Sequence, residues 1–192
     1  KLGMTPLQIR LLNAVESGHT CRSMMYVPHT EYKKTLQTAA DNCDFEAKYG
    51  HLPFGEGVGI SGGYYISGTS YTLYLSYKPH TVANVKIENE NNVVLFCGTT
   101  DIGQGVDMVM AQMAAETLGI RSEDVKVVSR DTELATFDLG TFASRVTYAS
   151  GWAIRRACEA ANQLLFPVAA AIMGCRGQEV GVKDYQFYSI YE

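Results

Sequence analysis

Residues 93–119 read VVLFCGTTDIGQGVDMVMAQMAAETLG, and the fold is decided here. A short apolar run ends at Gly98, and a tight loop, DIGQG, follows it. From Gln104 to Leu118, apolar residues recur at the spacing of one helix face, and Gly119 is suited to cap the helix end. The stretch therefore predicts a strand, a glycine-containing loop and a helix in direct succession.

The segments around this stretch extend the pattern in both directions. Residues 81–98, TVANVKIENENNVVLFCG, alternate apolar and polar side chains around Glu90-Asn91-Asn92, which predicts a β-hairpin. Residues 124–129, DVKVVS, predict a further short strand, and a long helix is expected from Ala143 to about Leu165. Pro167 should kink or restart that helix, because proline removes a backbone donor.

The N-terminal third contains weaker signals. Thr5-Pro6 predicts the start of a helix running to about Val15, and residues 31–42 predict a second helix. Residues 17–29 and 48–57 are expected to be loops, whereas residues 59–77 are strand-like. The order of elements predicts an α+β fold, with a β-hairpin or small mixed sheet packed against helices.

Composition excludes several classes of protein. Of the 192 residues, 46% are hydrophobic and 19% are charged, which suits one ordinary globular core. The net charge is −4 and the basic residues are scattered, so we expect neither nucleic acid nor an acidic membrane surface as a partner. The sequence lacks a signal peptide and a run of roughly 18 apolar residues, which favours a cytoplasmic protein. Because it begins with a lysine inside a predicted helix, we expect a fragment or processed piece.

The residues that commonly bind metals are dispersed. The 5 cysteines form no C-x-x-C pair and the 4 histidines form no H-E-x-x-H pair. Their spacing argues against a disulfide framework and against a zinc or iron–sulfur site, and it favours buried, reduced thiols. We therefore expect no metal held by protein side chains.

One glycine motif invites a dinucleotide-binding interpretation. Residues 57–62, GVGISG, match G-x-G-x-x-G, which in a Rossmann unit joins a strand to a helix. Here no strand precedes the motif and strand-like residues follow it. These glycines are better explained by a bend or a close backbone approach.

The DIGQG loop is the first candidate site. Backbone N–H groups at a helix start carry the positive end of the helix dipole, and Gly103 and Gly105 have no Cβ to obstruct a phosphate. The amide of Gln104 can donate and accept hydrogen bonds, as a pterin edge or a phosphate requires. The alternative is an ordinary glycine turn before a helix.

A second loop, Gly140 to Arg145, is a candidate for the same reason: glycine and small polar residues stand at the start of a predicted helix. Thr141 and Ser144 offer hydroxyls for capping or for phosphate, and Arg145 could bind an anion through its forked guanidinium. The alternative is a capped helix with a solvated arginine. If the two loops lie side by side, they would converge on one bulky dianionic ligand, which favours a nucleotide-like cofactor.

These two segments resemble a known family. GTTDIGQGVDMVMAQMAAETLGI and DVKVVSRDTELATFDLGTFASRVTYASG are similar to the molybdopterin-binding region of the large subunits of xanthine dehydrogenase and aldehyde oxidase, a group that includes carbon monoxide dehydrogenase and 4-hydroxybenzoyl-CoA reductase. KLGMTPLQIRLLN and GVGISGGYYISGTS also resemble the family's linking segments. The resemblance implies a helical linking segment over residues 1–55 and part of the molybdopterin-binding domain over residues 56–192.

The resemblance also implies a cofactor and partners. Molybdopterin, often as its cytosine dinucleotide, would hold molybdenum through its own dithiolene, and iron–sulfur clusters and FAD would lie on other domains or subunits. The remainder of the molybdenum subunit and a small-molecule substrate would complete the enzyme. The residues implied to contact the cofactor, largely through backbone N–H groups, are Gly103, Gln104, Gly105, Thr141, Phe142, Ala143, Ser144 and Arg145.

The family's catalytic glutamate, in a Gly-Glu motif near the end of the subunit, has no counterpart in this sequence. Glu56 in FGEG falls in the linking segment, and we interpret it as a surface loop residue. The chain alone is thus expected to be inactive. Two alternatives stay open: a noncatalytic assembly module, and, among enzymes, a reductive member acting on aromatic CoA thioesters instead of a hydroxylase of aldehydes, purines or other heterocycles.

Overall fold

The computed structural model describes residues 2–22, 24–65, 80–88 and 92–191. Among these residues, the chain forms two compact units, one ending at Tyr65 and the other beginning at His80. Each unit has its own hydrophobic core. The predicted domain boundary after residue 55 stays a prediction, since compactness alone assigns no role to either unit.

The N-terminal unit is built mainly from short helices. They are α1 (Pro6–Asn13), α2 (Tyr32–Asn42) and α3 (Phe45–Lys48), with a small antiparallel ladder of β1 (His19–Thr20) and β2 (Tyr26–Val27). The predicted helix at Thr5-Pro6 is confirmed, but it ends before Val15 because the chain turns extended at Ala14. The second predicted helix is also confirmed. The core of this unit consists of Leu7, Leu36, Ala40 and Phe45.

The strand-like segment after the GVGISG motif forms no strand where it is described. Residues 56–65 contain no regular element, so the prediction of a strand is wrong for residues 59–65, while residues 66–77 lie outside the described part of the chain. Val58 and Ile60 pack against the core of the N-terminal unit. Their partial burial accounts for the alternation of these two residues without a sheet.

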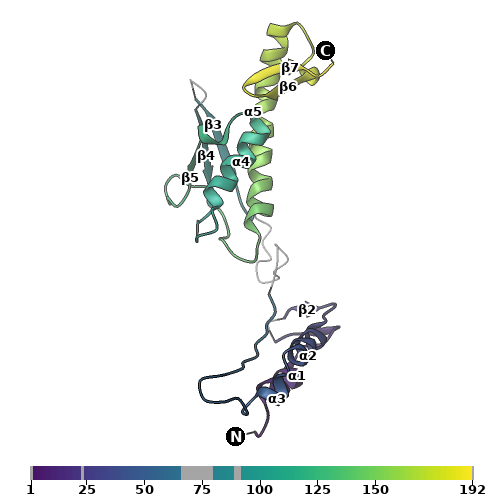
Figure 1. Ribbon diagram of the computed structural model, residues 1–192. Coiled ribbons are helices and arrows are strands. Elements are labelled where there is room, and N and C mark those ends of the chain that lie inside the picture. The colour runs from purple at the N-terminus through teal and green to yellow at the C-terminus, as the bar shows by residue number, and fades with distance from the viewer. Residues whose placement is uncertain (1, 23, 66–79, 89–91, 192) are drawn as a thin grey trace. The chain divides into compact units, whose positions relative to one another are not determined.

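The C-terminal unit contains a three-stranded sheet covered on one face by two helices (Figure 1). The strands are β3 (Ala83–Ile87), β4 (Val93–Cys97) and β5 (Val125–Val128), and the helices are α4 (Val106–Leu118) and α5 (Val146–Met173). β3 and β4 are antiparallel, which confirms the predicted hairpin, and β4 and β5 are parallel neighbours joined through α4. The α+β class is therefore confirmed.

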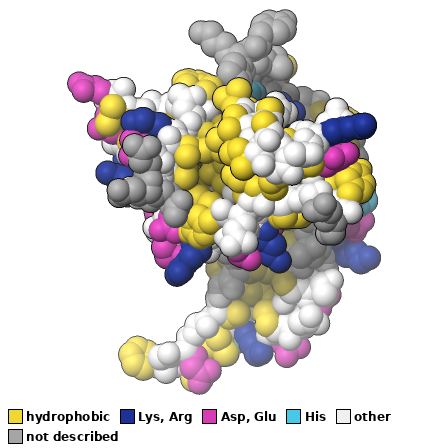
Figure 2. All heavy atoms as spheres, turned by 90° about the horizontal axis from the view of Figure 1, so that it is seen from above, with side chains coloured by type: hydrophobic (Ala, Val, Ile, Leu, Met, Phe, Trp, Pro, Cys, Tyr) yellow, Lys and Arg dark blue, Asp and Glu magenta, His cyan; other side chains and the backbone are white. Residues whose placement is uncertain are grey.

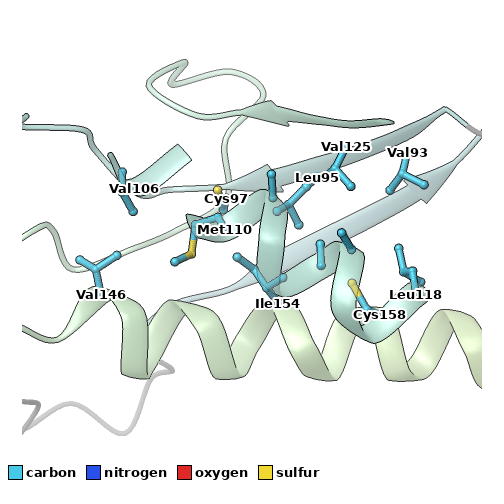
Figure 3. Close-up of a cluster of buried hydrophobic side chains, with 13 residues drawn as sticks. Val93, Leu95, Cys97, Val106, Met110, Leu118, Val125, Val146, Ile154 and Cys158 are labelled. Carbon is cyan, nitrogen blue, oxygen red and sulfur yellow. The ribbon is translucent and has the colours of Figure 1, made fainter. Parts of the chain in front are cut away.

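The core of this unit lies between the sheet and the two helices (Figure 3). β4 contributes Leu95 and Cys97, α4 contributes Met110, and α5 contributes Ile154 and Cys158, all fully buried. Burial raises the pKa of the Cys158 thiol to about 12. This arrangement fixes the ends of β4 and the starts of both helices, which is where the candidate loops lie.

Helix α5 differs from its prediction at both ends. It begins at Val146 instead of Ala143, and it continues through Pro167 to Met173 as one helix. Its last turns pack Ala169 and Ala170 against Val180 of a C-terminal hairpin that the sequence analysis did not predict. This antiparallel hairpin is formed by β6 (Val180–Lys183) and β7 (Gln186–Ser189), and one 3-10 turn at Gly177–Glu179 precedes β6. Tertiary packing thus outweighs the local cost of the proline.

Large hydrophobic side chains are also exposed. Figure 2, which is viewed from above Figure 1, shows hydrophobic side chains gathered on the face of the C-terminal unit that it displays. On α5, Leu164, Val168 and Ile172 are spaced one helical turn apart and are 78%, 61% and 82% exposed. None of the helices in the described ranges is long and apolar enough to cross a membrane.

Candidate cofactor-binding site

The first candidate loop leaves β4 through a tightly packed glycine. A Cβ on Gly98 would lie 2.2 Å from the carbonyl oxygen of Thr136 and 2.8 Å from the Cβ of Asp138, so only glycine fits there. The hydroxyl of Thr136 donates to the carbonyl of Val82, which ties the same segment to the chain entering β3. The base of the loop is therefore held by backbone packing from three parts of the unit.

In the DIGQG loop, the carboxylate of Asp101 accepts hydrogen bonds from backbone amides of the same loop. Asp101 Oδ1 accepts hydrogen bonds from the N–H of Gly103 at 2.8 Å and of Gly105 at 3.4 Å. The N–H of Gly103 contributes most to holding the Asp101 pKa below its usual range. The amides that the sequence assigned to a phosphate are thus competent to bind an anion, and in this structure the anion is Asp101.

The side chain of Gln104 folds back on its own loop. Its Oε1 accepts from the N–H of Ile102 at 2.7 Å, and its Nε2 donates to the carbonyl of Thr100 at 3.3 Å. The helix expected to begin at or just after Gln104 is confirmed: Gly105 is the N-cap in the left-handed region, with φ 74°, and α4 begins at Val106. Gln104 therefore shapes the loop, whatever it contacts in addition.

Gly103 and Gly105 leave the outer side of this loop open. Both have positive φ, 103° and 74°, a region that residues with a Cβ rarely adopt. No heavy atom of the described chain lies within 4 Å of a Cβ built on either residue. A ligand can consequently approach the backbone here at close range.

The second candidate loop lies directly against the first. Thr141 Oγ1 accepts from the N–H of Thr100 at 3.2 Å and donates to the carbonyl of Thr100 at 2.8 Å. This pair of bonds shows that the two loops lie side by side, which was the condition for their converging on one ligand. Thr141 is therefore the residue that joins them.

A strained turn precedes α5. The N–H of Arg145 donates to the carbonyl of Phe142 at 3.2 Å, and the two central residues, Ala143 and Ser144, both have φ 52°. Left-handed conformations at two successive residues other than glycine are unfavourable and concentrate at functional sites. No acceptor for the N–H of Ala143 or Ser144 is found among the described residues. Ser144 is exposed, whereas Ala143 is buried, so a ligand that reaches this turn would approach it from the Ser144 side.

Arg145 is placed differently from either sequence interpretation. Its side chain is 1% exposed, so it is not a solvated arginine. Nη1 donates to Asp138 Oδ1 at 2.7 Å and to the carbonyl of Gly140 at 2.7 Å, while Nη2 donates to the carbonyl of His80 at 3.0 Å. The guanidinium fork is thus bound to the protein itself, which corrects the expectation that it faces an anion.

Asp138 was missed by the sequence analysis, although it is the centre of this network. Burial raises its pKa, but hydrogen bonds from Thr81, Gly140, Arg145 and Ser150 outweigh burial, so the pKa lies below its usual range. The Ser150 hydroxyl donates to Asp138 Oδ2 at 2.8 Å. An acidic residue in a loop gives no local signal of such burial.

A partly exposed arginine, Arg130, lies at the start of α4, close to the DIGQG loop. Arg130, two residues after β5, donates to Asp107 Oδ2 at 2.5 Å, and Ser129 donates to the other oxygen of that carboxylate at 3.1 Å. The Arg130 side chain is 56% exposed, and its charge also lowers the pKa of Asp101. This arginine, rather than Arg145, has a guanidinium that solvent or a ligand can reach.

The described residues fit an anionic cofactor better than a metal ion. Within the described ranges, no three His, Cys, Asp or Glu side chains gather as a metal site. The loops instead offer open glycines, backbone amides and an internal carboxylate that marks where an anion binds. Glu56 is an exposed loop residue of the other unit, as expected. A cofactor that carries its own metal would need only hydrogen bonds and positioning from these loops.

Comparisons with known proteins assign the family. Residues 34–191 match the model of the molybdopterin cofactor-binding domain. The chain is 31% identical over 181 residues to the xanthine dehydrogenase molybdenum-binding subunit of Escherichia coli O157:H7, an alignment covering 90% of this chain and 23% of that protein. This chain therefore belongs to the molybdopterin-binding domain family of the molybdenum hydroxylases.

Solved structures agree with this assignment. The crystal structure of the Cu,Mo-CO dehydrogenase matches with a TM-score of 0.56 and 25% identity, over 97% of this chain and 26% of that one. Quinoline 2-oxidoreductase from Pseudomonas putida 86 matches with a TM-score of 0.56 over 98% of this chain and 26% of that one. At 20% identity, the latter supports the fold alone. The chain spans about a quarter of the length of these relatives.

Proposed function

We propose that this chain supplies one part of the molybdopterin cradle of a molybdenum-dependent oxidoreductase. The observation that carries the proposal is the junction of the two loops at Thr141, which brings the DIGQG loop and the Phe142–Arg145 turn together. The amides of Gly103, Gly105, Ala143 and Ser144 are the groups we assign to the cofactor. Phe142 and Thr141 shape the space between the loops, and Gln104 and Arg145 hold the loops in place.

The kind of donors present supports a role for these loops in binding phosphate. Backbone amides and hydroxyls near helix starts suit phosphate oxygens. We therefore propose that these loops bind the phosphate portion of the cofactor, and the cytosine dinucleotide form, with its additional phosphate, would use more of them. Binding also requires the Asp101 carboxylate to leave the amides of Gly103 and Gly105, or the phosphate to use neighbouring donors.

The complete enzyme would require further protein. We propose that the remainder of the molybdenum subunit closes the metal pocket and brings the catalytic glutamate, and that iron–sulfur and flavin domains or subunits carry the electrons away. The substrate is a small molecule: an aldehyde, a purine or another heterocycle to be hydroxylated, or an aromatic CoA thioester to be reduced. This chain by itself would not turn over substrate.

The first experiment measures the cofactor directly. The complete subunit that contains this chain is expressed with its partner subunits and purified, and its molybdenum and released cytosine nucleotide are quantified by mass spectrometry. Near-stoichiometric molybdenum together with the nucleotide is expected. A folded complex that contains neither would contradict the proposal and favour a noncatalytic assembly module.

A pair of glycine variants locates the cofactor within the complex. Gly103→Ala and Gly55→Ala introduce a Cβ at similar positive φ, 103° and 93°, with no heavy atom of the described chain within 4 Å in either case. Both should therefore carry a similar conformational penalty of about 1 kcal/mol. Only Gly103→Ala should lower the molybdenum and pterin content. Equal losses in the two variants would argue against a role of the DIGQG loop.

A further inference from the structure

The turn before α5 has an energetically unfavourable backbone conformation. Ala143 and Ser144 are both left-handed, and each such residue is disfavoured by roughly five- to thirtyfold relative to an ordinary conformation. Ser144 is exposed and its side chain makes no hydrogen bond among the described residues, so the side chain of Ser144 itself does not hold the turn. Something outside the turn must therefore hold it in this conformation.

The groups that surround Arg145 meet this requirement. Its guanidinium connects three separate points of the chain: the carboxylate of Asp138, the carbonyl of Gly140 and the carbonyl of His80. Gly140 is the residue at which the loop turns toward the strained residues, and its N–H also donates to Asp138 at 2.7 Å. One side chain thus fixes the start of the loop, while its own backbone N–H closes the strained turn.

The network reaches into the helix and the segment before the sheet. Ser150, in the second turn of α5, donates to Asp138, and Thr81 contacts the Ser150 hydroxyl at 3.4 Å. The guanidinium carbon also lies 5.7 Å from the centre of the Phe142 ring. Arg145 Nε is buried and has no acceptor among the described residues. This unmade hydrogen bond lowers the stability that the Asp138–Arg145 pair can contribute. Replacing a buried ion pair by hydrophobic residues of similar volume is often neutral or stabilising, so stability alone does not explain this pair.

We propose that the buried Asp138–Arg145 pair is a positioning device, which holds Ala143 and Ser144 in the left-handed conformation that presents their amides to the cofactor. Arg145 then acts through the backbone it holds and does not touch the ligand. This inference rests on the proposed function, and it assigns to Arg145 a role different from the direct anion contact that its sequence context suggests.

The test uses the complete molybdenum subunit with its partner subunits. Arg145→Lys retains a buried positive charge but loses the fork that binds three acceptors. We expect cofactor to be released about tenfold faster from this variant, measured as molybdenum and pterin remaining on the protein over time, a change within the range that the two left-handed residues permit. Hydrogen exchange of a peptide spanning residues 139–146 should become faster in the same variant.

A glycine rescue separates positioning from general stability. Ser144→Gly removes the left-handed penalty within the turn, and Asp184→Gly removes a similar penalty, at φ 49°, in the exposed turn between β6 and β7. In the Arg145→Lys background, Ser144→Gly should restore cofactor retention and Asp184→Gly should not. Cofactor retention is also measured for each glycine variant in the wild-type background. The effect of losing the Ser144 hydroxyl can then be subtracted from the effect seen in the Arg145→Lys background.

The outcomes are distinguishable. If Arg145→Lys retains the cofactor as the wild type does, or if both glycines rescue it equally, the positioning role is overturned. If the wild-type complex contains no molybdenum and no pterin, the proposed function fails, and hydrogen exchange of residues 139–146 still decides the role of Arg145. Should Arg145→Lys not fold, Ser150→Ala perturbs Asp138 more gently, and a smaller loss of the same sign is expected.

Discussion

At the scale of single residues, Asp138 joins several buried hydrogen bonds of the C-terminal unit. It is completely buried and paired with an equally buried arginine, and removing one partner of such a pair leaves the other charge uncompensated. The low pKa of Asp138 means that the folded protein favours the ionised carboxylate more strongly than the unfolded chain does. Its contribution to stability must therefore depend on pH.

Asp138→Asn should lower the free energy of unfolding by about 3–5 kcal/mol at neutral pH. The wild-type advantage should be complete above the unfolded pKa of about 3.9, and it should be lost as the pH falls from there through the lower folded pKa. Denaturant titrations of both proteins at several pH values measure this. Glu159→Gln, which breaks an exposed pair with Arg155, is the control and should cost about 1 kcal/mol or less. A pH-independent difference would contradict the assignment.

Asp101 permits a second prediction at this scale. Its carboxylate accepts from the N–H groups of Gly103 and Gly105, and the first of these bonds is the main cause of its low pKa. Asp101→Asn should speed hydrogen exchange of these two amides at neutral pH, because a neutral amide oxygen is a weaker acceptor than a carboxylate. Exchange measured by NMR or mass spectrometry tests this. Unchanged exchange at both positions would show that other groups protect them.

At the scale of elements, α5 combines a buried side and an exposed side of the same residue types. Ile154 is completely buried between the helices and the sheet, whereas Ile172 is 82% exposed. Ile154→Ala should lower the free energy of unfolding by about 2–5 kcal/mol through lost burial and a residual cavity. Ile172→Ala should change it by about 0.5 kcal/mol or less. Denaturant midpoints at constant m-value give both numbers, and similar losses would contradict the packing described.

Pro167 offers a prediction about helix continuity. It lies inside α5, where a proline leaves one carbonyl of the preceding turn without its helical partner. Pro167→Ala should therefore raise the free energy of unfolding, by up to about 3 kcal/mol. Thermal unfolding measures the change. A decrease would indicate that the proline is required by the packing near Gly177, where an added Cβ would lie 3.8 Å from the Pro167 Cα.

At the scale of the whole molecule, the two units have separate cores. Leu36 belongs to the core of the N-terminal unit and Leu95 to that of the C-terminal unit, and the two clusters share no residue. Leu36→Ala and Leu95→Ala should each cost about 2–5 kcal/mol in their own unit, and their effects should add in the double variant. Calorimetry of the two single variants and the double variant tests this. A coupling well above about 0.5 kcal/mol would show that the two cores depend on each other.

Much of the C-terminal unit could be predicted from sequence because its signals are local. The alternation around residues 90–92 predicted the β3–β4 hairpin, and the helical spacing after residue 104 predicted α4. Patterns of this kind depend on neighbours within one or two turns. The same rule failed for residues 59–65, where Ile60, like the preceding Val58, is partly buried against the core of the N-terminal unit instead of lying in a sheet.

The candidate site was predictable in its location but not in its internal roles. Glycines and small polar residues before two helices indicated both loops, and the Thr141–Thr100 bonds show that they meet. Nothing near Asp101 or Asp138 indicated that one fills the amides of its own loop and that the other is buried beneath the turn. Both roles depend on geometry that a one-dimensional pattern does not contain.

The sequence alone thus determined the α+β class, the two glycine-containing loops and the resemblance to molybdopterin-binding domains, because these follow from periodicity, loop chemistry and motif order. Only the tertiary structure decided that α5 runs through Pro167, which follows from packing against β6 and β7. It also decided that Arg145 is an internal support, because one of its acceptors, the carbonyl of His80, is 65 residues away in the chain. A charged side chain acquires its partners from the whole fold, and local sequence cannot specify them.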